Sequence, residues 1–123
     1  MPDTADNLTL ALDRTDGGYR PGEAITGLMR WSLRQPPERI DVRLFWWTSG
    51  KGSSDSGLAG ELTFEGLAAQ GEQAIVFDTP AGPYSFSGKL VTIQWAVEAV
   101  ARPGKEVARA AVVLSATGSE VTV

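Results

Sequence analysis

The chain has 123 residues and a formal net charge of −4, from 11 basic and 15 acidic side chains. Its length suits one folded domain, residues 1–123, and a hydrophobic content of 42% is sufficient for a core. The chain has no cysteine and no histidine, which excludes disulfides, thiolate metal sites, the commonest general base and the commonest transition-metal ligand.

Short strands separated by turn residues are predicted along the whole chain. Each strand alternates apolar and polar residues, which is typical of a strand with one face in a core. In chain order the predicted strands cover residues 8–13, 25–34, 40–47, 62–64, 75–77, 90–99 and 107–114, with 121–123 as an eighth. Between the third and fourth strands, Ser49–Gly60 is expected to be a loop rich in glycine and serine. Seven to eight mostly antiparallel strands predict an all-β, immunoglobulin-like sandwich.

Aromatic residues give the clearest indication of a functional surface. Trp31, Trp46 and Trp95 fall on the apolar face of their strands, so we expect them in the core. Phe45 and Trp47 fall on the opposite face, on the same side as Arg43. Adjacent exposed aromatics beside an arginine often mark a contact surface, which makes Arg43, Phe45 and Trp47 the candidate interaction surface. The alternative is that the Ser49–Gly60 loop or a local bulge covers the two rings.

Two segments of the chain resemble the arrestin-like β-sandwich family, of the N-terminal arrestin type. Residues Tyr19 to Gly27 (YRPGEAITG) are similar to an early turn in which an aromatic residue, Pro-Gly-Glu, a β-branched residue and a glycine lead into a strand. Residues Phe77 to Ala99 are similar to a segment in which Phe-x-x-Pro precedes Pro-x-Ser-Phe-x-Gly and a strand with an aromatic-x-Val pattern.

The resemblance implies an arrestin-like sandwich, as a single-domain member of bacterial type. It also implies a non-catalytic role, in which the sandwich docks on other proteins as an adaptor or scaffold. Members of the family typically carry two sandwiches, whereas this chain has room for one, so no activation switch and no receptor-binding residue is transferred to it. Some bacterial members act in sporulation or stress control.

Catalysis is not expected from this sequence. Without histidine or cysteine, a nucleophile and its base would have to be serine with lysine, or a pair of carboxylates. The three lysines, Lys51, Lys89 and Lys105, lie in or beside predicted turns, where the burial that lowers a lysine pKa is rare. The carboxylates show no pairing pattern. We therefore expect no enzyme activity, no metal and no cofactor.

The expected partner is another protein, and the exposed rings would also suit self-association as a homodimer. The alternative function is a carbohydrate-binding module that stacks sugar rings on Trp47 beside Arg43. Basic residues are spread along the chain, so nucleic-acid binding is not expected. No apolar run approaches the ~20 residues of a membrane span. Residues 1–7 do not resemble a signal peptide, so we expect a cytoplasmic location.

Overall fold

The computed structural model describes residues 7–14, 18–50, 55–83, 85–87, 91–104, 106–115 and 121–122. These residues form ten β-strands and no helix. Seven strands have five or more residues: β1 (Leu8–Leu12), β3 (Ala24–Ser32), β4 (Arg39–Gly50), β5 (Ser56–Glu65), β6 (Gln70–Asp78), β8 (Val91–Arg102) and β9 (Val107–Leu114). Three have two residues each: β2 (Gly18–Tyr19), β7 (Phe86–Ser87) and β10 (Val121–Thr122).

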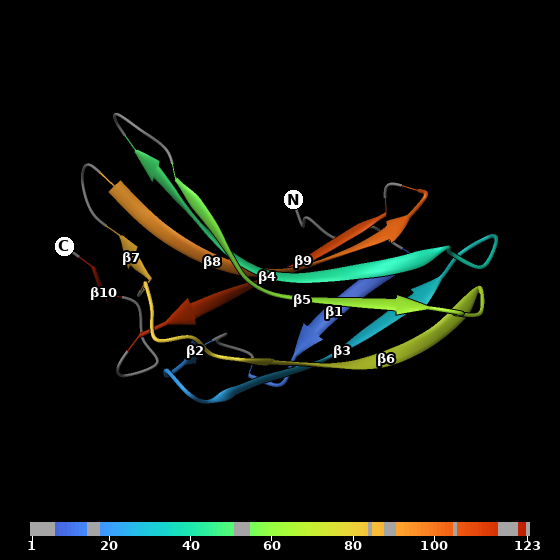
Figure 1. Cartoon of the computed structure of the whole chain (residues 1–123), viewed down its shortest axis with the longest axis horizontal. Helices are drawn as coiled ribbons and strands as arrows, with labels where there is room; N and C mark the ends of the chain where they lie inside the picture. The colour runs from blue at the N-terminus through green and yellow to red at the C-terminus, as the bar shows by residue number, and fades with distance from the viewer. Residues whose placement is uncertain are drawn as a thin grey trace.

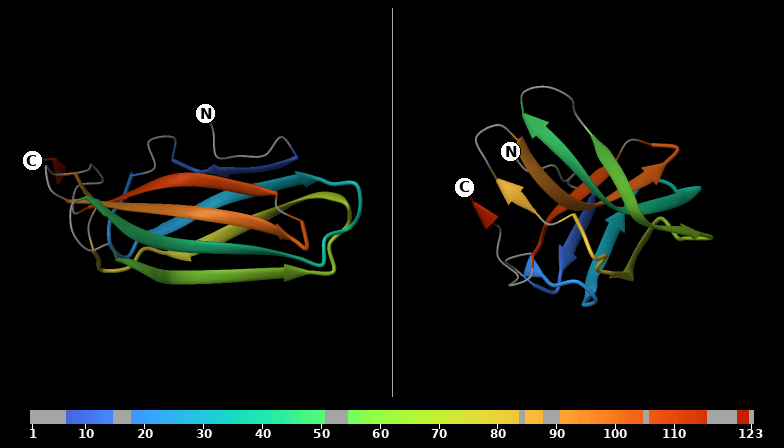
Figure 2. Two further views of the ribbon diagram at one scale, coloured as in Figure 1. Left: turned by 90° about the horizontal axis from the view of Figure 1, so that it is seen from above. Right: turned by 60° about the vertical axis from the view of Figure 1, so that its left-hand side comes forward.

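The strands form two sheets that pack face to face (Figure 1). The smaller sheet has the order β1-β3-β6 and is antiparallel throughout. The larger sheet is built on the antiparallel order β9-β8-β4-β5. Seen from above in the left view of Figure 2, the long strands of the larger sheet cover the smaller one. The right view and Figure 1 show that the end of β4 and the start of β5 curve away from the smaller sheet. The described residues therefore form the predicted all-β sandwich.

Three short strands extend the larger sheet. β7 and β9 pair with successive parts of the same edge of β8, since Phe86 is the partner of Ile93 and Val112 that of Trp95. β10 runs parallel to β7, and β2 runs parallel to β9. All other strand pairs are antiparallel, so the sandwich is mostly antiparallel, as predicted.

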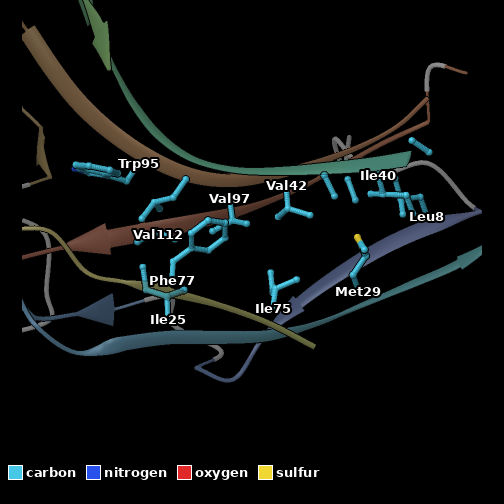
Figure 3. Packing of buried hydrophobic residues seen from close by; sticks show 14 of the residues in the cluster. Leu8, Ile25, Met29, Ile40, Val42, Ile75, Phe77, Trp95, Val97 and Val112 are labelled. Atoms are coloured by element: carbon cyan, nitrogen blue, oxygen red, sulfur yellow. The ribbon is translucent and has the colours of Figure 1, made fainter. Parts of the chain in front are cut away.

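The core lies between the sheets, and Figure 3 shows side chains of β1, β3, β4, β6, β8 and β9 that meet there. Ile40, Val42 and Leu44 of β4 face it from the larger sheet, and Ile25 and Met29 of β3 face it from the smaller one. Each of these side chains is at most 1% exposed. Fully burying a side chain of this size contributes ~1.5–3 kcal/mol, so the hydrophobic effect holds the two sheets together.

Two of the three predicted core tryptophans are buried, and the third is at the margin of the core. Trp31 is 6% exposed and Trp95 is 2% exposed. Trp46 is partly buried and packs against the core cluster. Each of the two buried indoles donates its N–H to a backbone carbonyl, Trp31 to Ala68 at 2.9 Å and Trp95 to Pro83 at 2.6 Å. Burial of the indole therefore leaves no polar atom without a partner.

The predicted Ser49–Gly60 loop is wrong at both ends. Strand β4 continues to Gly50, and β5 already begins at Ser56, so the two form a long hairpin whose residues 51–54 lie outside the described residues. The glycines and serines of this segment suggested a loop because they have low strand propensity. Two pairings override that local preference. Residues from Ser56 onward pair with β4, and β4 itself pairs with β8 as far as Gly50.

The segment Tyr19 to Gly27 folds as a tight turn followed by β3. Pro21 and Gly22 occupy its centre, and Gly22 has φ of +84°, which only glycine adopts without strain. The Glu23 N–H donates to the Arg20 carbonyl at 3.1 Å, and the Arg20 N–H donates to the Glu23 carboxylate at 2.6 Å. The Pro-Gly-Glu sequence therefore closes the turn with both its backbone and the side chain of its last residue.

Arg14 anchors this turn to the end of β1. Its guanidinium donates to both carboxylate oxygens of Glu23, each at 2.9 Å, and lies 4.7 Å from the centre of the Tyr19 ring. Tyr19 is fully buried and donates its hydroxyl to Asp13 at 2.5 Å. The hydrogen bonds from Arg14 and from the Arg20 N–H lower the pKa of Glu23 from 4.5 to about 2. Protonation of Glu23 at low pH therefore weakens the interactions that hold this turn.

Acid is expected to destabilise the chain through Glu23. The pKa of this group is lower in the folded chain than in the unfolded one, so its contribution is complete above pH 4.5 and is lost as the pH falls toward about 2. We expect Glu23→Gln to lower the thermal unfolding midpoint at neutral pH and to reduce the further loss between pH 4.5 and 2. Circular dichroism melts of both proteins across this range measure the difference. An equal loss in both would show that other carboxylates account for it.

Candidate interaction surface

Strand β4 places Arg43, Phe45 and Trp47 on the outer face of the larger sheet, because successive side chains of a strand point to opposite faces. Their neighbours Val42 and Leu44 point into the core. Arg43 is exposed, and the two rings are partly buried. We use "outer face" for this side of strands β9, β8, β4 and β5.

Phe45 and Trp47 stack on each other and form an aromatic pair. Their ring centroids are 5.3 Å apart with an interplanar angle of 29°. In this offset arrangement the rings gain ~0.5–1.5 kcal/mol beyond the area they bury. The two rings therefore stabilise each other on the outer face.

A bulge in β5 brings a third apolar side chain to the aromatic pair. The register pairs Leu44 with Gly60 and Phe45 with Leu58, so Ala59 is the extra residue of the bulge. Without the bulge, Leu58 would fall opposite Trp46 and point to the inner face. Leu58 is instead 58% exposed, the largest exposed fraction of the large apolar side chains in the described part of the chain.

The arginine that contacts the rings is Arg109 of β9. Its guanidinium carbon lies 5.5 Å from the centre of the Phe45 ring and 5.7 Å from that of Trp47, so it reaches across β8 to both rings. It also donates to the Glu98 carboxylate at 2.6 and 3.2 Å. Such cation–π contacts contribute ~0.5–1 kcal/mol at exposed sites. Arg43, which the sequence pattern associated with the rings, bonds Glu61 on β5 at 2.7 Å instead.

Four charged side chains cross the outer face in a single line, which we call the charge row. Arg109 of β9 is the partner of Glu98 of β8, Glu98 is the partner of Arg43 of β4, and Arg43 is the partner of Glu61 of β5. The sign of the charge therefore alternates from strand to strand. All four side chains are partly accessible, with exposed fractions between 22% and 47%.

A hollow of about 320 Å³ lies beside the aromatic pair. Its lining combines the apolar Phe45 and Leu58 with the charged Arg43 and Glu98. A larger hollow of about 350 Å³ lies at the far end of the sandwich, between Pro37 and Arg102, and its walls carry both signs of charge. Within the described part of the chain, the buried side-chain oxygens without a partner are those of Thr79 and Ser115, and neither residue lines these hollows.

Asp41 is the only carboxylate of β4 and points to the outer face. It is nevertheless buried by its neighbours, with an exposed fraction of 6%. It accepts hydrogen bonds from Arg102 at 2.9 Å, Arg39 at 3.2 Å and Thr63 at 3.1 Å. Burial acts to raise the pKa of Asp41, but these three hydrogen bonds outweigh it and hold the pKa below the usual 3.8. The group is therefore ionised at neutral pH and fully engaged, which suits a structural role.

The described residues contain no group of three or more histidine, cysteine, aspartate or glutamate side chains placed to hold a metal ion. Lys51, Lys89 and Lys105 lie outside the described residues. The part of the chain that the structure describes contains no helix with the length and apolar character needed to cross a membrane.

Comparison with solved structures places the fold. The chain is similar to the crystal structure of Spo0M, a sporulation control protein from Bacillus subtilis, with a TM-score of 0.55 and 16% sequence identity. The match covers 90% of this chain and 50% of Spo0M, so the chain spans half the length of that protein. The sequence matches no protein-family model, and no curated protein matches it significantly. Spo0M has an arrestin-like β-sandwich fold, and the structural similarity shows the same fold for this chain.

Proposed function

We propose that the chain is a non-catalytic protein-interaction module, of the adaptor or scaffold kind, that binds its partner through the outer face of β9-β8-β4-β5. The observation that carries this proposal is the exposed Leu58 beside the aromatic pair, with a hollow between them. Aromatic and arginine side chains at the centre of a patch, with exposed charges around it, are typical of protein interfaces. The likeness to a sporulation control protein agrees with a regulatory rather than a catalytic role.

A carbohydrate-binding role has less support. Sugar recognition by aromatic residues needs an open ring face on which a pyranose can stack. Phe45 and Trp47 use ring surface on each other and on the Arg109 guanidinium. Arg43, the polar group expected beside Trp47, is bonded to Glu61. This arrangement suits a protein partner that inserts a side chain beside the rings better than it suits a sugar that stacks on them.

Replacing Phe45 and Trp47 with serine is expected to abolish partner binding while leaving the sandwich folded, since both rings lie outside the core cluster. The test immobilises three proteins: the wild type, the Phe45→Ser, Trp47→Ser double variant and a Val76→Ser control. A lysate of the native cells is passed over each, and the retained proteins are identified by quantitative mass spectrometry. Val76 is 53% exposed and lies on β6 of the other sheet, so its variant controls for loss of a surface apolar group. The proposal expects proteins that the wild type and the control retain and the double variant loses.

Retention of the same proteins by all three baits would contradict the assignment of the outer face as the binding surface. Circular dichroism of the double variant checks that the fold is intact.

A further inference from the structure

The charge row is complementary to itself when its order is reversed. Read from β9 to β5 it is positive, negative, positive, negative, and read from β5 to β9 it is negative, positive, negative, positive. Neighbouring strands lie ~4.8 Å apart, so the four positions are evenly spaced. A two-fold axis that runs parallel to the strands, between β8 and β4, reverses the order in the facing copy. Arg109 then faces Glu61 of the second copy, and Arg43 faces Glu98 of the second copy.

The two-fold axis perpendicular to the strands gives the opposite result. It places each position of the charge row opposite the same position of the second copy, so that like charges face each other. Juxtaposed like charges at an interface disfavour the arrangement that contains them. The charge row therefore selects one orientation of the two copies, in which each strand runs parallel to the same strand of the second copy and antiparallel to the strand that it faces.

The neighbouring row of the outer face agrees with the same axis. From β9 to β5 it contains Ala111, Ala96, Phe45 and Leu58, two small residues followed by two large ones. Reversal places the exposed Leu58 opposite the exposed Ala111 of the second copy, so a large apolar side chain meets a small one. Ala96 is only 1% exposed in the single chain, so Phe45 of the second copy meets the side chains that cover Ala96. Close packing at this row therefore comes from Leu58 and Ala111.

We propose that the partner of the outer face is a second copy of this chain, in a two-fold dimer with the larger sheets face to face. This inference rests on the proposed function and names the partner of the same surface. The outer edge of β5 offers a weaker route to self-association. β5 carries Glu61 and Glu65 and no basic residue, and the bulge at Ala59 interrupts its edge.

The dimer is expected to be weak. Four strands give a face ~19 Å wide. The two shorter strands, β9 and β5, have 8 and 10 residues and limit the shared length to about 30 Å. The contact is then on the order of 600 Å² per copy, below the ~800 Å² per partner of a standard stable interface. We expect a concentration-dependent equilibrium between monomer and dimer, with a dissociation constant in the micromolar range.

Complementary charge reversal tests the proposed orientation. Glu61→Arg places two arginines opposite each other at both ends of the charge row, and Arg109→Glu places two glutamates there. Each variant alone is expected to weaken the dimer by about tenfold or more, equivalent to ~1.4 kcal/mol. An equimolar mixture of the two variants restores opposite charges at both positions, so it is expected to dimerise like the wild type. Sedimentation equilibrium or light scattering over a concentration series measures the dimer fraction of each variant and of the mixture.

Matched controls come from the other sheet. Arg30 and Glu72 are cross-strand partners of β3 and β6, form an exposed ion pair at 3.0 Å, and lie far from the charge row in the fold. Arg30→Glu and Glu72→Arg change the net charge as Arg109→Glu and Glu61→Arg do. They are expected to dimerise like the wild type, and circular dichroism confirms that all four variants fold.

A wild type that stays monomeric up to millimolar concentration would overturn the dimer. Variants of the charge row that dimerise like the wild type, or a mixture that fails to recover, would overturn its orientation. These failures are separable from failure of the proposed function. A monomeric chain that still retains a foreign protein through Phe45 and Trp47 keeps the interaction module and loses only the second copy as its partner.

Discussion

Trp95→Ala is expected to lower the free energy of unfolding by ~3–5 kcal/mol, the range for truncating a buried aromatic side chain. Trp95 is 2% exposed in the core between the sheets, so its removal leaves a cavity that rigid strands fill only in part (Figure 3). Domains of this size are stable by ~5–15 kcal/mol, so the loss is a large fraction of the total. Urea denaturation with a linear extrapolation measures it.

Trp95→Phe separates the packing of this residue from its hydrogen bond. Phenylalanine keeps most of the ring but loses the indole N–H that donates to the Pro83 carbonyl at 2.6 Å. We expect a loss of about 1–2 kcal/mol, from the bond and the carbonyl left without a donor. Val76→Ala, at a position 53% exposed, serves as the control and is expected to change stability by less than ~0.5 kcal/mol. If Trp95→Ala cost no more than Val76→Ala, the placement of this indole in the core would be wrong.

Gly27→Ala is expected to cost ~2–3 kcal/mol, toward the upper end for overpacking a well-packed site. A Cβ atom at this position would lie 2.7 Å from the backbone carbonyl oxygen of Ala11 and 3.1 Å from the Leu12 side chain. The oxygen belongs to the backbone of β1, which is paired with β3, so only a displacement of the strand relieves the contact. Thermal and urea unfolding of the variant measure the loss.

Ser32→Ala is the matched control for this substitution. Ser32 lies on the same strand β3 and its side chain is exposed, so we expect a change within ~0.5 kcal/mol. An equal effect of the two variants would mean that β1 adjusts without cost. Gly27 ends the segment that resembles the arrestin-like turn, and the close approach of β1 gives a physical reason for a glycine there.

Local alternation in the sequence was sufficient to place most of the strands and their core faces. The predicted strand 107–114 coincides with β9, and the predicted strand 8–13 extends one residue beyond β1. The parity of 40–47 correctly placed Ile40, Val42 and Leu44 in the core and Phe45 on the outer face. The alternation predicted these faces because each strand has one apolar face, and a few consecutive residues are enough to reveal that pattern.

The ends of β4 and β5 could not be predicted in the same way. Residues 56–61 contain two glycines, a serine and a bulge, which give no alternating signal. They are in a strand because β4 offers them hydrogen-bonding partners along its length. The burial of Asp41 was equally absent from the pattern, since it depends on Arg102, which lies 61 residues away in the chain.

The sequence by itself determined the fold class, the faces of the strands and the turn at Pro21-Gly22, since each depends on residues that are close together in the chain. The tertiary structure alone decided which strands are neighbours and in what register. That register places Arg109 over the aromatic pair, Leu58 beside it and four alternating charges in one row. Register is set by the packing of the whole core, because a slip of one residue would turn every apolar side chain of a strand to the wrong face.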